Sequence, residues 1–215
     1  MTIDDFIGLL ESLPARALCF NPYSSGDGAC DAIRRQNLRL YLTEMKTAHP
    51  DTLLVGEAPG YNGCHWSGIP FTSERQLVRG VARHGLFGPG KGYRWTSGRE
   101  QGYTEPSGTI LWDIIGELPR LPLVWNAFPL HPYKAGLPLS NRTPTDVELN
   151  ELSFVLHALG ELFHIRRHIA IGRKAEAVLA GLGIQAPGVR HPANGGKNAC
   201  RDGLLALLGT PHARA

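Results

Sequence analysis

Four short segments carry the side chains best suited to chemistry, and they are far apart along the chain. They are Gly56–Gly60, Gly68–Phe71, Trp125–Pro129 and His191–Ala193. The first supplies a carboxylate and the last an imidazole, and both groups can stabilise charge or move a proton. The third supplies a side-chain amide, which presents an acceptor and donors on one plane, and the second supplies an aromatic ring. These side chains are therefore candidates for a ligand-binding or catalytic site.

The elements that must position these side chains are short apolar strands alternating with amphipathic helices. Strands are predicted at 52–55, 121–125, 168–171 and 188–191, and helices at 28–47, 73–84, 110–118, 144–163, 175–182 and 200–208. This alternation is typical of βα units, so we expect the α/β class. The predicted architecture is a single-domain three-layer α/β/α sandwich with a central, mostly parallel four-stranded sheet. Such sheets bind ligands at the carboxyl ends of their strands, where three of the four segments lie.

Capping residues predict where two of the helices begin. Ser73 and Gln76 have the spacing of a capping box, which opens a helix that Gly85 ends. Thr143 is the predicted N-cap of the long helix, with Pro144 at its first position. His65, His131 and His164 have no partner evident in the sequence, and we expect them on the surface or in loops.

Composition indicates a globular protein with many loops. The chain has 215 residues, of which 42% are hydrophobic and 19% charged, with 26 Gly and 16 Pro. This argues against a disordered chain or a coiled coil. We predict one domain over residues 1–215, with residues 1–50 forming a helical segment packed on it. No apolar run approaches the roughly 20 residues of a membrane span, so no membrane partner is expected. The acidic N-terminus does not resemble a signal peptide, and we expect a cytoplasmic monomer.

Charge and cysteine content constrain partners and cofactors. The formal net charge of +3 permits a polyanionic partner without requiring one. The cysteines, which are Cys19, Cys30, Cys64 and Cys200, form no C-x-x-C pair and are predicted to be structural thiols, with no metal site. The 85–107 stretch is a long loop with basic residues, and loops of this length are usually functional or mobile.

The four segments, in their order and spacing, resemble the active-site motifs of the uracil-DNA glycosylase superfamily. The segment Asn141–Thr145 also resembles one in the thermophilic iron–sulfur branch, so the likeness spans about residues 52–208. There are departures from that branch. Its cluster cysteines are absent from the matching surroundings, so no cluster and no other cofactor is expected. Ala58 occupies the position where the best-known branch has an Asp, and Gly60 the position of a Tyr that excludes the thymine methyl, with Tyr61 one step later.

The resemblance implies hydrolysis of the bond between a DNA base and deoxyribose. This passes through a cationic sugar and an anionic base, and needs no metal. Phe71 would stack on the base, Asn126 would read the O4 and N3–H edge of uracil, and His191 would hydrogen-bond O2. Glu57 is assigned to water positioning or cation stabilisation, with Asn62 as its substitute. Backbone around Gly56 and Ala58, together with Tyr61, would complete the base pocket.

Contacts with DNA are expected from groups directed at the phosphate backbone. The helix start at Thr72 and Ser73 would hold a phosphate. The other candidates lie in loops near the same sheet edge and are Arg75, Arg173, Arg190, Asn194 and Lys197. The loop Ala193–Gly196 has no apolar side chain to fill a vacated base stack. We therefore expect a preference for single-stranded DNA or mismatched duplexes.

The sequence leaves two alternatives open. The chain is either a monofunctional glycosylase that removes uracil, or a protein of the same fold that binds damaged or single-stranded DNA with little or no cleavage. The preferred base also stays open among uracil, hypoxanthine, xanthine and modified uracils, because the departure at Gly60 permits a wider pocket.

Overall fold

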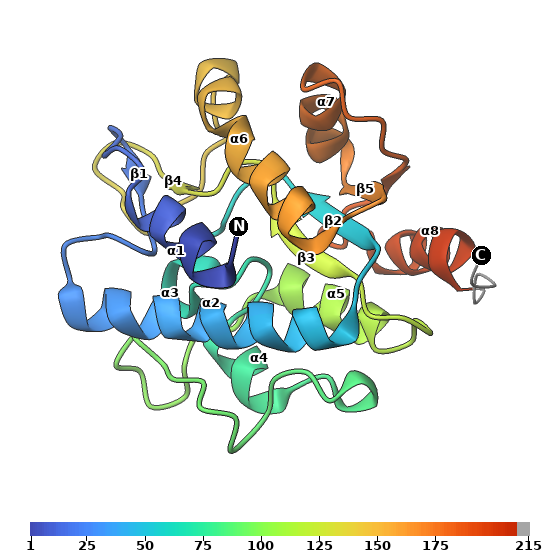
Figure 1. The fold of residues 1–215 in the computed structure, drawn as a ribbon, viewed down its shortest axis with the longest axis horizontal. Helices are drawn as coiled ribbons and strands as arrows, with labels where there is room; N and C mark the ends of the chain where they lie inside the picture. The colour runs from blue at the N-terminus through green and yellow to red at the C-terminus, as the bar shows by residue number, and fades with distance from the viewer. Residues whose placement is uncertain (210–215) are drawn as a thin grey trace.

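The computed structural model describes residues 1–209. Its helices and strands alternate along most of the chain (Figure 1). The helices are α1 (Ile3–Glu11), α2 (Gly28–Ala48), α3 (Cys64–Ser67), α4 (Glu74–Arg79), α5 (Pro106–Ile115), α6 (Asp146–Phe163), α7 (Arg173–Gly181) and α8 (Lys197–Leu208). The strands are β1 (Cys19–Phe20), β2 (Thr52–Gly56), β3 (Leu123–Asn126), β4 (His131–Pro132), β5 (Arg167–Ile171) and β6 (Gly188–Val189). Within residues 1–209, no helix combines the length and the apolar character that a membrane crossing requires.

The central sheet has four parallel strands in the order β3-β2-β5-β6, which confirms the predicted α/β fold class. In Figure 1, α6 and α7 lie above these strands and α5 lies below them, so helices flank the sheet in three layers. β2 is completely buried because it has neighbours on both sides and helices on both faces. A separate antiparallel pair joins β1 to β4. The parallel arrangement brings the carboxyl ends of all four strands to one edge.

The N-terminal segment packs onto the core, where Phe6 of α1 meets Trp125 of β3 edge to face at a ring-centroid distance of 5.5 Å. The buried hydroxyl of Tyr41 in α2 donates to the backbone oxygen of Val124 and accepts from its nitrogen. These contacts tie α1 and α2 to the strand that ends at Asn126. The four cysteines are free thiols.

The long loop between Gly85 and Glu105 is anchored by one buried carboxylate. Glu74 is fully buried, and its oxygens accept hydrogen bonds from the backbone of Thr96, Ser97 and Tyr103 and from the Ser97 hydroxyl. Trp95 also donates to the Glu74 carbonyl. Satisfying a buried carboxylate in this way fixes the loop that leads into α5.

The structure corrects several predicted helix ends. The N-cap of α6 is Thr145, which forms a capping box with Glu148, whereas Thr143 was predicted. Ser73 caps α4 as predicted, but Gln76 does not return the bond and donates to Gly80 instead. α4 ends at Arg79 because the backbone of Gly80, with φ +72°, is not helical.

Three other helices begin earlier than predicted, and one of them is α7, which starts at Arg173 rather than 175. α5 starts at Pro106 rather than 110, since proline is favoured at the first helical position, and α8 starts at Lys197 rather than 200. The predicted last strand over 188–191 is limited to Gly188–Val189. This shorter strand leaves His191 in the loop that follows it.

His65 and His131 are buried and paired, contrary to the expectation of surface or loop positions. Their Nδ1 atoms are 3.0 Å apart, and Nε2 of His131 is 2.8 Å from the carbonyl oxygen of Ser140. This partner places the His131 proton on Nε2, so its Nδ1 accepts from His65. The His65 ring also stacks on Phe20 at a centroid distance of 3.9 Å. Burial lowers the pKa of His65 to about 3, with further lowering from His131, and burial lowers the pKa of His131 as well.

Stability is expected to fall on acidification because of this pair. The folded pKa values lie below the unfolded value of about 6.5, so the unfolded chain binds more protons below that pH. The contribution of the two histidines to the free energy of unfolding should be complete above pH 6.5. It should decrease by up to about 1.4 kcal/mol per pH unit for each histidine as the pH falls toward 4. Urea titrations from pH 7.5 to 4.5 measure this.

The control variant is His65→Phe, which retains a ring to stack on Phe20 and removes one titrating group. The slope of unfolding free energy against pH should be shallower in this variant than in the native chain. Equal slopes would contradict a role for His65 in the pH dependence.

Candidate functional site

A cavity of about 360 Å³ opens at the carboxyl edge of the sheet. Parts of three predicted segments contribute to its wall, together with the start of α7 and the start of α5. The lining residues are Glu57, Ala58, Gly60, Phe71, Glu105, Ser107, Asn141, Ile171, Gly172, Arg173, Lys174, Arg190 and His191. This volume is in the range of ligand pockets. The edge of the sheet chosen from the sequence is therefore hollow and is lined by both acidic and basic groups.

The end of β2 controls how closely two of the predicted groups approach. Gly56 pairs in register with Asn126 of β3. A Cβ at Gly56 would lie 2.5 Å from Oδ1 of Asn126 and would overlap the ring of Phe71. Phe71 itself has φ +55°, a left-handed conformation that few non-glycine residues adopt. Only glycine at position 56 thus allows the ring and the amide to meet there.

Asn126 presents an unused acceptor. The residue is 2% exposed, and within the described residues its Oδ1 has no hydrogen-bond partner. Buried polar atoms are usually paired, so this oxygen is a candidate ligand contact. Asn126 does not itself line the cavity and is covered by its neighbours. Contact between a ligand and Oδ1 therefore requires the neighbouring side chains to shift.

The His191 ring is held as a neutral hydrogen-bond donor. Its Nδ1 accepts from the backbone N–H of Ala193 at 3.2 Å, which leaves the proton on Nε2. Burial lowers the pKa of His191, and the charge of Arg190 lowers it further. The ring centroid is 6.5 Å from that of Phe71. Gly172 has φ +91°, and a Cβ there would lie 2.9 Å from Cβ of His191, so this glycine gives the histidine its room.

Glu57 reaches the cavity beside a cation. Its Oε2 is 3.5 Å from Nζ of Lys174, and its Oε1 is buried with no hydrogen-bond partner in the described part of the chain. The Glu57 carbonyl accepts from the backbone of Phe128, and the Gly56 carbonyl accepts from Ala127. These two hydrogen bonds connect the segment Gly56–Gly60 to the segment Trp125–Pro129.

Several residues that line this cavity were not among the predicted site residues, including Glu105, Asn141 and Lys174. Oε2 of Glu105 is buried and has no hydrogen-bond partner within residues 1–209, although other parts of the residue are accessible. Burial raises the pKa of Glu105 to about 7. Oδ1 of Asn141 accepts from the backbone N–H of Tyr61 at 3.0 Å. The available signal for Glu105 was Pro106, which marks a helix start and so places its neighbour at a helix N-terminus.

The remaining base-pocket predictions have different placements. Ala58 lines the cavity as expected. Tyr61 and Asn62 are partly buried and do not line it, and Tyr61 reaches Asn141 through its backbone alone. Asn62 is thus not placed to substitute for Glu57.

Thr72 and Ser73 are buried, contrary to the prediction that they hold a phosphate. Their exposed fractions are 0% and 2%. The Thr72 hydroxyl donates to the Pro70 carbonyl and accepts from Trp112, and the Ser73 hydroxyl accepts from the backbone of Gln76. The Thr72 hydroxyl holds the turn that carries Phe71 and the Ser73 hydroxyl caps α4, so both are used internally.

The predicted DNA-contacting residues fall into two groups. Arg173 and Arg190 line the 360 Å³ cavity, and Asn194 and Lys197 are exposed in the chain that follows His191. Arg75 instead lines a separate, more open cavity of about 630 Å³ with Arg79, Trp95 and others. Thr104 and Thr109 line that cavity while Glu105 and Ser107 line the first, so one short segment forms a wall of both.

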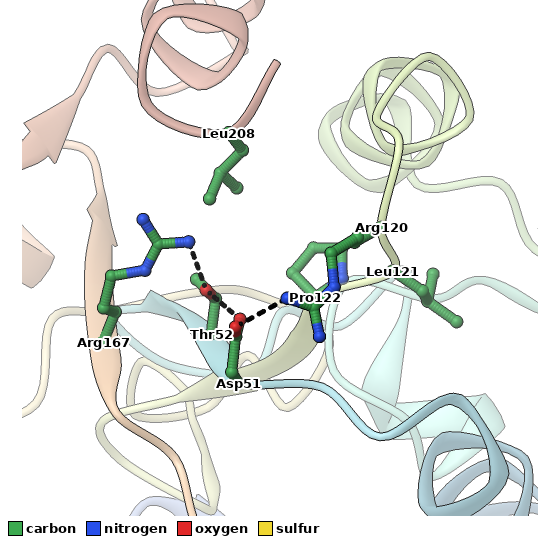
Figure 2. Close-up of a pocket in the computed structure, with 7 residues that line it drawn as sticks. All are labelled: Asp51, Thr52, Arg120, Leu121, Pro122, Arg167 and Leu208. Carbon is green, nitrogen blue, oxygen red and sulfur yellow. Dashed lines mark hydrogen bonds and ion pairs between the residues drawn. The ribbon is translucent and has the colours of Figure 1, made fainter. Parts of the chain in front are cut away.

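A very small pocket lies at the opposite edge of the sheet (Figure 2). Its volume is about 20 Å³, which is room for about one water molecule. Arg120 pairs with Asp51 at 2.9 Å, and Arg167 donates to Thr52 at 3.1 Å. The polar groups drawn there thus contact each other across the start of β2, and the pocket is too small for a planar ring.

Comparison with known proteins identifies the fold. No family model matches the chain, and no curated protein matches it. Among solved structures, the crystal structure of wild-type Pedobacter heparinus SMUG2 matches with a TM-score of 0.62 and 16% sequence identity. The match covers 96% of this chain and 97% of that chain. At this identity the likeness shows a shared fold over almost the whole of both chains.

Gly56→Ala should disrupt the site, because the added Cβ has no room against Phe71 and Asn126. We expect a loss of about 1–3 kcal/mol in the free energy of unfolding from overpacking. Chemical denaturation measures the loss, and a crystal structure of the variant should show Phe71 displaced.

Gly160→Ala is the matched control. Gly160 lies inside α6 with open space around its Cα, so alanine should stabilise the helix by about 0.5–1 kcal/mol. A Gly56→Ala protein as stable as the native chain would contradict the close approach at the end of β2.

Proposed function

We propose that the protein is a DNA glycosylase that hydrolyses the N-glycosidic bond of uracil, or of a related deaminated base, and leaves an abasic site. The observation that carries the proposal is the convergence of Phe71, Asn126 and His191, from three distant segments, at one end of the sheet. The resemblance of the four segments to the uracil-DNA glycosylase superfamily, together with the fold shared with Pedobacter heparinus SMUG2, supports this reaction class.

The leaving base is stabilised by His191. As the C1′–N1 bond breaks, its electron pair moves onto the base, and negative charge collects on O2. The neutral ring donates from Nε2, which the Ala193 bond at Nδ1 keeps protonated. A donor aimed at developing charge is worth about 3–4 kcal/mol in comparable sites. Glu57 supplies a carboxylate at the cavity wall to stabilise the cationic sugar.

The Asn126 amide provides selectivity for uracil over cytosine. Its Oδ1 accepts from N3–H of uracil and its Nδ2 donates to O4. Cytosine presents the reverse pattern at these positions and would leave buried groups unpaired, which discriminates more strongly than shape. The unused Oδ1 of the free protein is the observation that supports this role. Phe71 stacks on the extruded base, and a stack of this kind contributes about 1–3 kcal/mol.

The DNA backbone is proposed to cross the basic rim of the cavity. Arg173, Lys174 and Arg190 line it, and Lys197 and Asn194 are exposed beyond His191. These groups position the strand without reading sequence. Arg75 extends the basic surface to the neighbouring 630 Å³ cavity. Thr72 and Ser73 are omitted because they are buried.

Activity on uracil should depend on Asn126. The native protein, incubated with a single-stranded oligonucleotide containing one uracil and then treated with alkali, should yield a strand break at the uracil. Asn126→Ala should lower the single-turnover rate by at least about 100-fold, since both base contacts are lost. Asn150→Ala, an exposed amide on α6, is the control and should cleave normally. Retention of the oligonucleotide by the native protein without any break would favour the DNA-binding alternative.

Duplex substrates should be cleaved according to the stability of the pair that contains uracil. The loop after His191 offers Ala193 and Asn194 and no large apolar side chain to fill a vacated stack. Without such a side chain, contacts in the duplex offset little of the few kcal/mol needed to unpair the base. We expect single strands to be cleaved fastest, followed by U·G and then U·A pairs. Equal single-turnover rates for the two duplexes would show that the missing apolar side chain does not limit extrusion of the base.

A further inference from the structure

The cavity contains a second carboxyl, Glu105, around which three glycines leave space. A Cβ at Gly63 would overlap Oε2 of Glu105, and one at Gly108 would lie 3.1 Å from it. A Cβ at Gly60 would lie 3.7 Å from Oε1. Gly60 and Gly63 belong to the loop after β2, and Gly108 lies in α5. Side chains at these positions would crowd the carboxyl or fill the space beside it.

Glu105 has no internal partner that explains its burial. Oε2 is inaccessible and accepts no hydrogen bond from residues 1–209. Glu105 is the N-cap of α5 by position, but its side chain makes no capping bond. Burying a carboxyl without a partner destabilises the folded state, so such groups are found mainly at functional sites. Because Glu105 lies on the cavity wall, we expect its function to be in this cavity.

Asn141 supplies a donor next to this carboxyl. Its Oδ1 is already used by the Tyr61 N–H, which fixes the orientation of the amide. From a Cβ at Gly60, Nδ2 of Asn141 would be 3.6 Å away and Oε1 of Glu105 3.7 Å away. An acceptor and a donor therefore border the same space beside Gly60. A water molecule there could donate to Glu105 and accept from Asn141.

The two carboxyls of the cavity differ in their surroundings. Glu57 lies 3.5 Å from Lys174, whereas Glu105 forms no ion pair among the described residues. Burial raises the pKa of Glu105, so its carboxylate form is a good proton acceptor. Glu57 is thus suited to stabilising a cation, and Glu105 is suited to accepting a proton.

We infer that Glu105, with Asn141 beside it, holds and deprotonates the water molecule that attacks the sugar. This inference rests on the proposed glycosylase function and names the general base of the same site. The C1′–N1 bond breaks and its electron pair leaves with the base, which His191 stabilises. The water oxygen forms a bond to C1′, and one water proton passes to the Glu105 carboxylate. That proton is later released to solvent, and no other reactant is needed.

The pH dependence follows from the burial of Glu105. Burial raises its pKa to about 7, so the base form is half populated near neutral pH. The titratable or charged groups that share the cavity are Glu57 from the loop after β2, Arg173 and Lys174 from α7, and Arg190 and His191 from the chain after β6. Cys64 of α3 is the other titratable neighbour, and Glu105 contributes to its raised pKa. Burial alone accounts for the shift of Glu105, so its titration should dominate the acid limb.

Glu105→Gln tests the inference, with Glu100→Gln as the control. Glu100 is an exposed carboxylate in the same loop region. Single-turnover cleavage of uracil in single-stranded DNA is measured from pH 5.5 to 9. The native rate should rise with pH through about 7 and then level off, and the control should follow it. Glu105→Gln should be at least about 100-fold slower at pH 8.5, with no rise near pH 7, and the deficit should shrink below about tenfold at pH 5.5.

Binding is measured in parallel with an oligonucleotide that contains 2′-fluoro-2′-deoxyuridine, which resists cleavage. Glu105→Gln should bind it within about threefold of the native protein. A variant with native rates and an unchanged pH profile overturns the inference alone. A variant that loses binding by more than tenfold while its rate stays within threefold also overturns it, because Glu105 would then contact the base. A native protein that cleaves no uracil substrate overturns the proposed function together with the inference.

Discussion

The absence of a side chain at Gly56 is the constraint on which the candidate site depends. β2 and β3 run side by side, and their last paired residues are Gly56 and Asn126. Any Cβ at position 56 would occupy the space where the Phe71 ring meets the Asn126 amide. The left-handed backbone at Phe71 and the buried hydroxyls of Thr72 and Ser73 then hold the ring at that spot. One hydrogen atom in place of a methyl group thus allows two separate segments to meet at the end of β2.

The fold was largely predictable because parallel strands and amphipathic helices produce strong local patterns. Burial of β2 on both faces requires a continuous apolar run, and the helix of residues 146–163 shows a clear apolar stripe. The ends of elements were less predictable, since several residue types compete as caps. Thr143 and Thr145 both precede an acidic turn, and only Thr145 has Glu148 three residues later to complete the box. The pairing of His65 with His131 joins residues 66 apart, and no local pattern reports it.

The site was predictable where chemistry and strand ends coincide, and not elsewhere. Phe71, Asn126 and His191 follow strands or a short turn, so topology alone brings them to one edge. Glu105 comes from the end of a long loop whose path is set by the buried carboxylate of Glu74, a tertiary feature invisible in the sequence. The prediction for Ser73 was wrong for a local reason, because its hydroxyl accepts a hydrogen bond from its own helix and is buried there.

Three of the unpaired buried polar atoms in the described part of the chain lie at the carboxyl edge of the sheet. Oδ1 of Asn126, Oε1 of Glu57 and Oε2 of Glu105 are buried and accept no hydrogen bond from residues 1–209, and all three lie around one end of β2. Each unpaired atom costs about 1–3 kcal/mol in the free protein. At the opposite edge the charged groups pair with each other, as Arg120 does with Asp51. The fold thus satisfies its charged groups at one edge of the sheet and leaves buried polar atoms unpaired at the other, which is the edge that the proposed function uses.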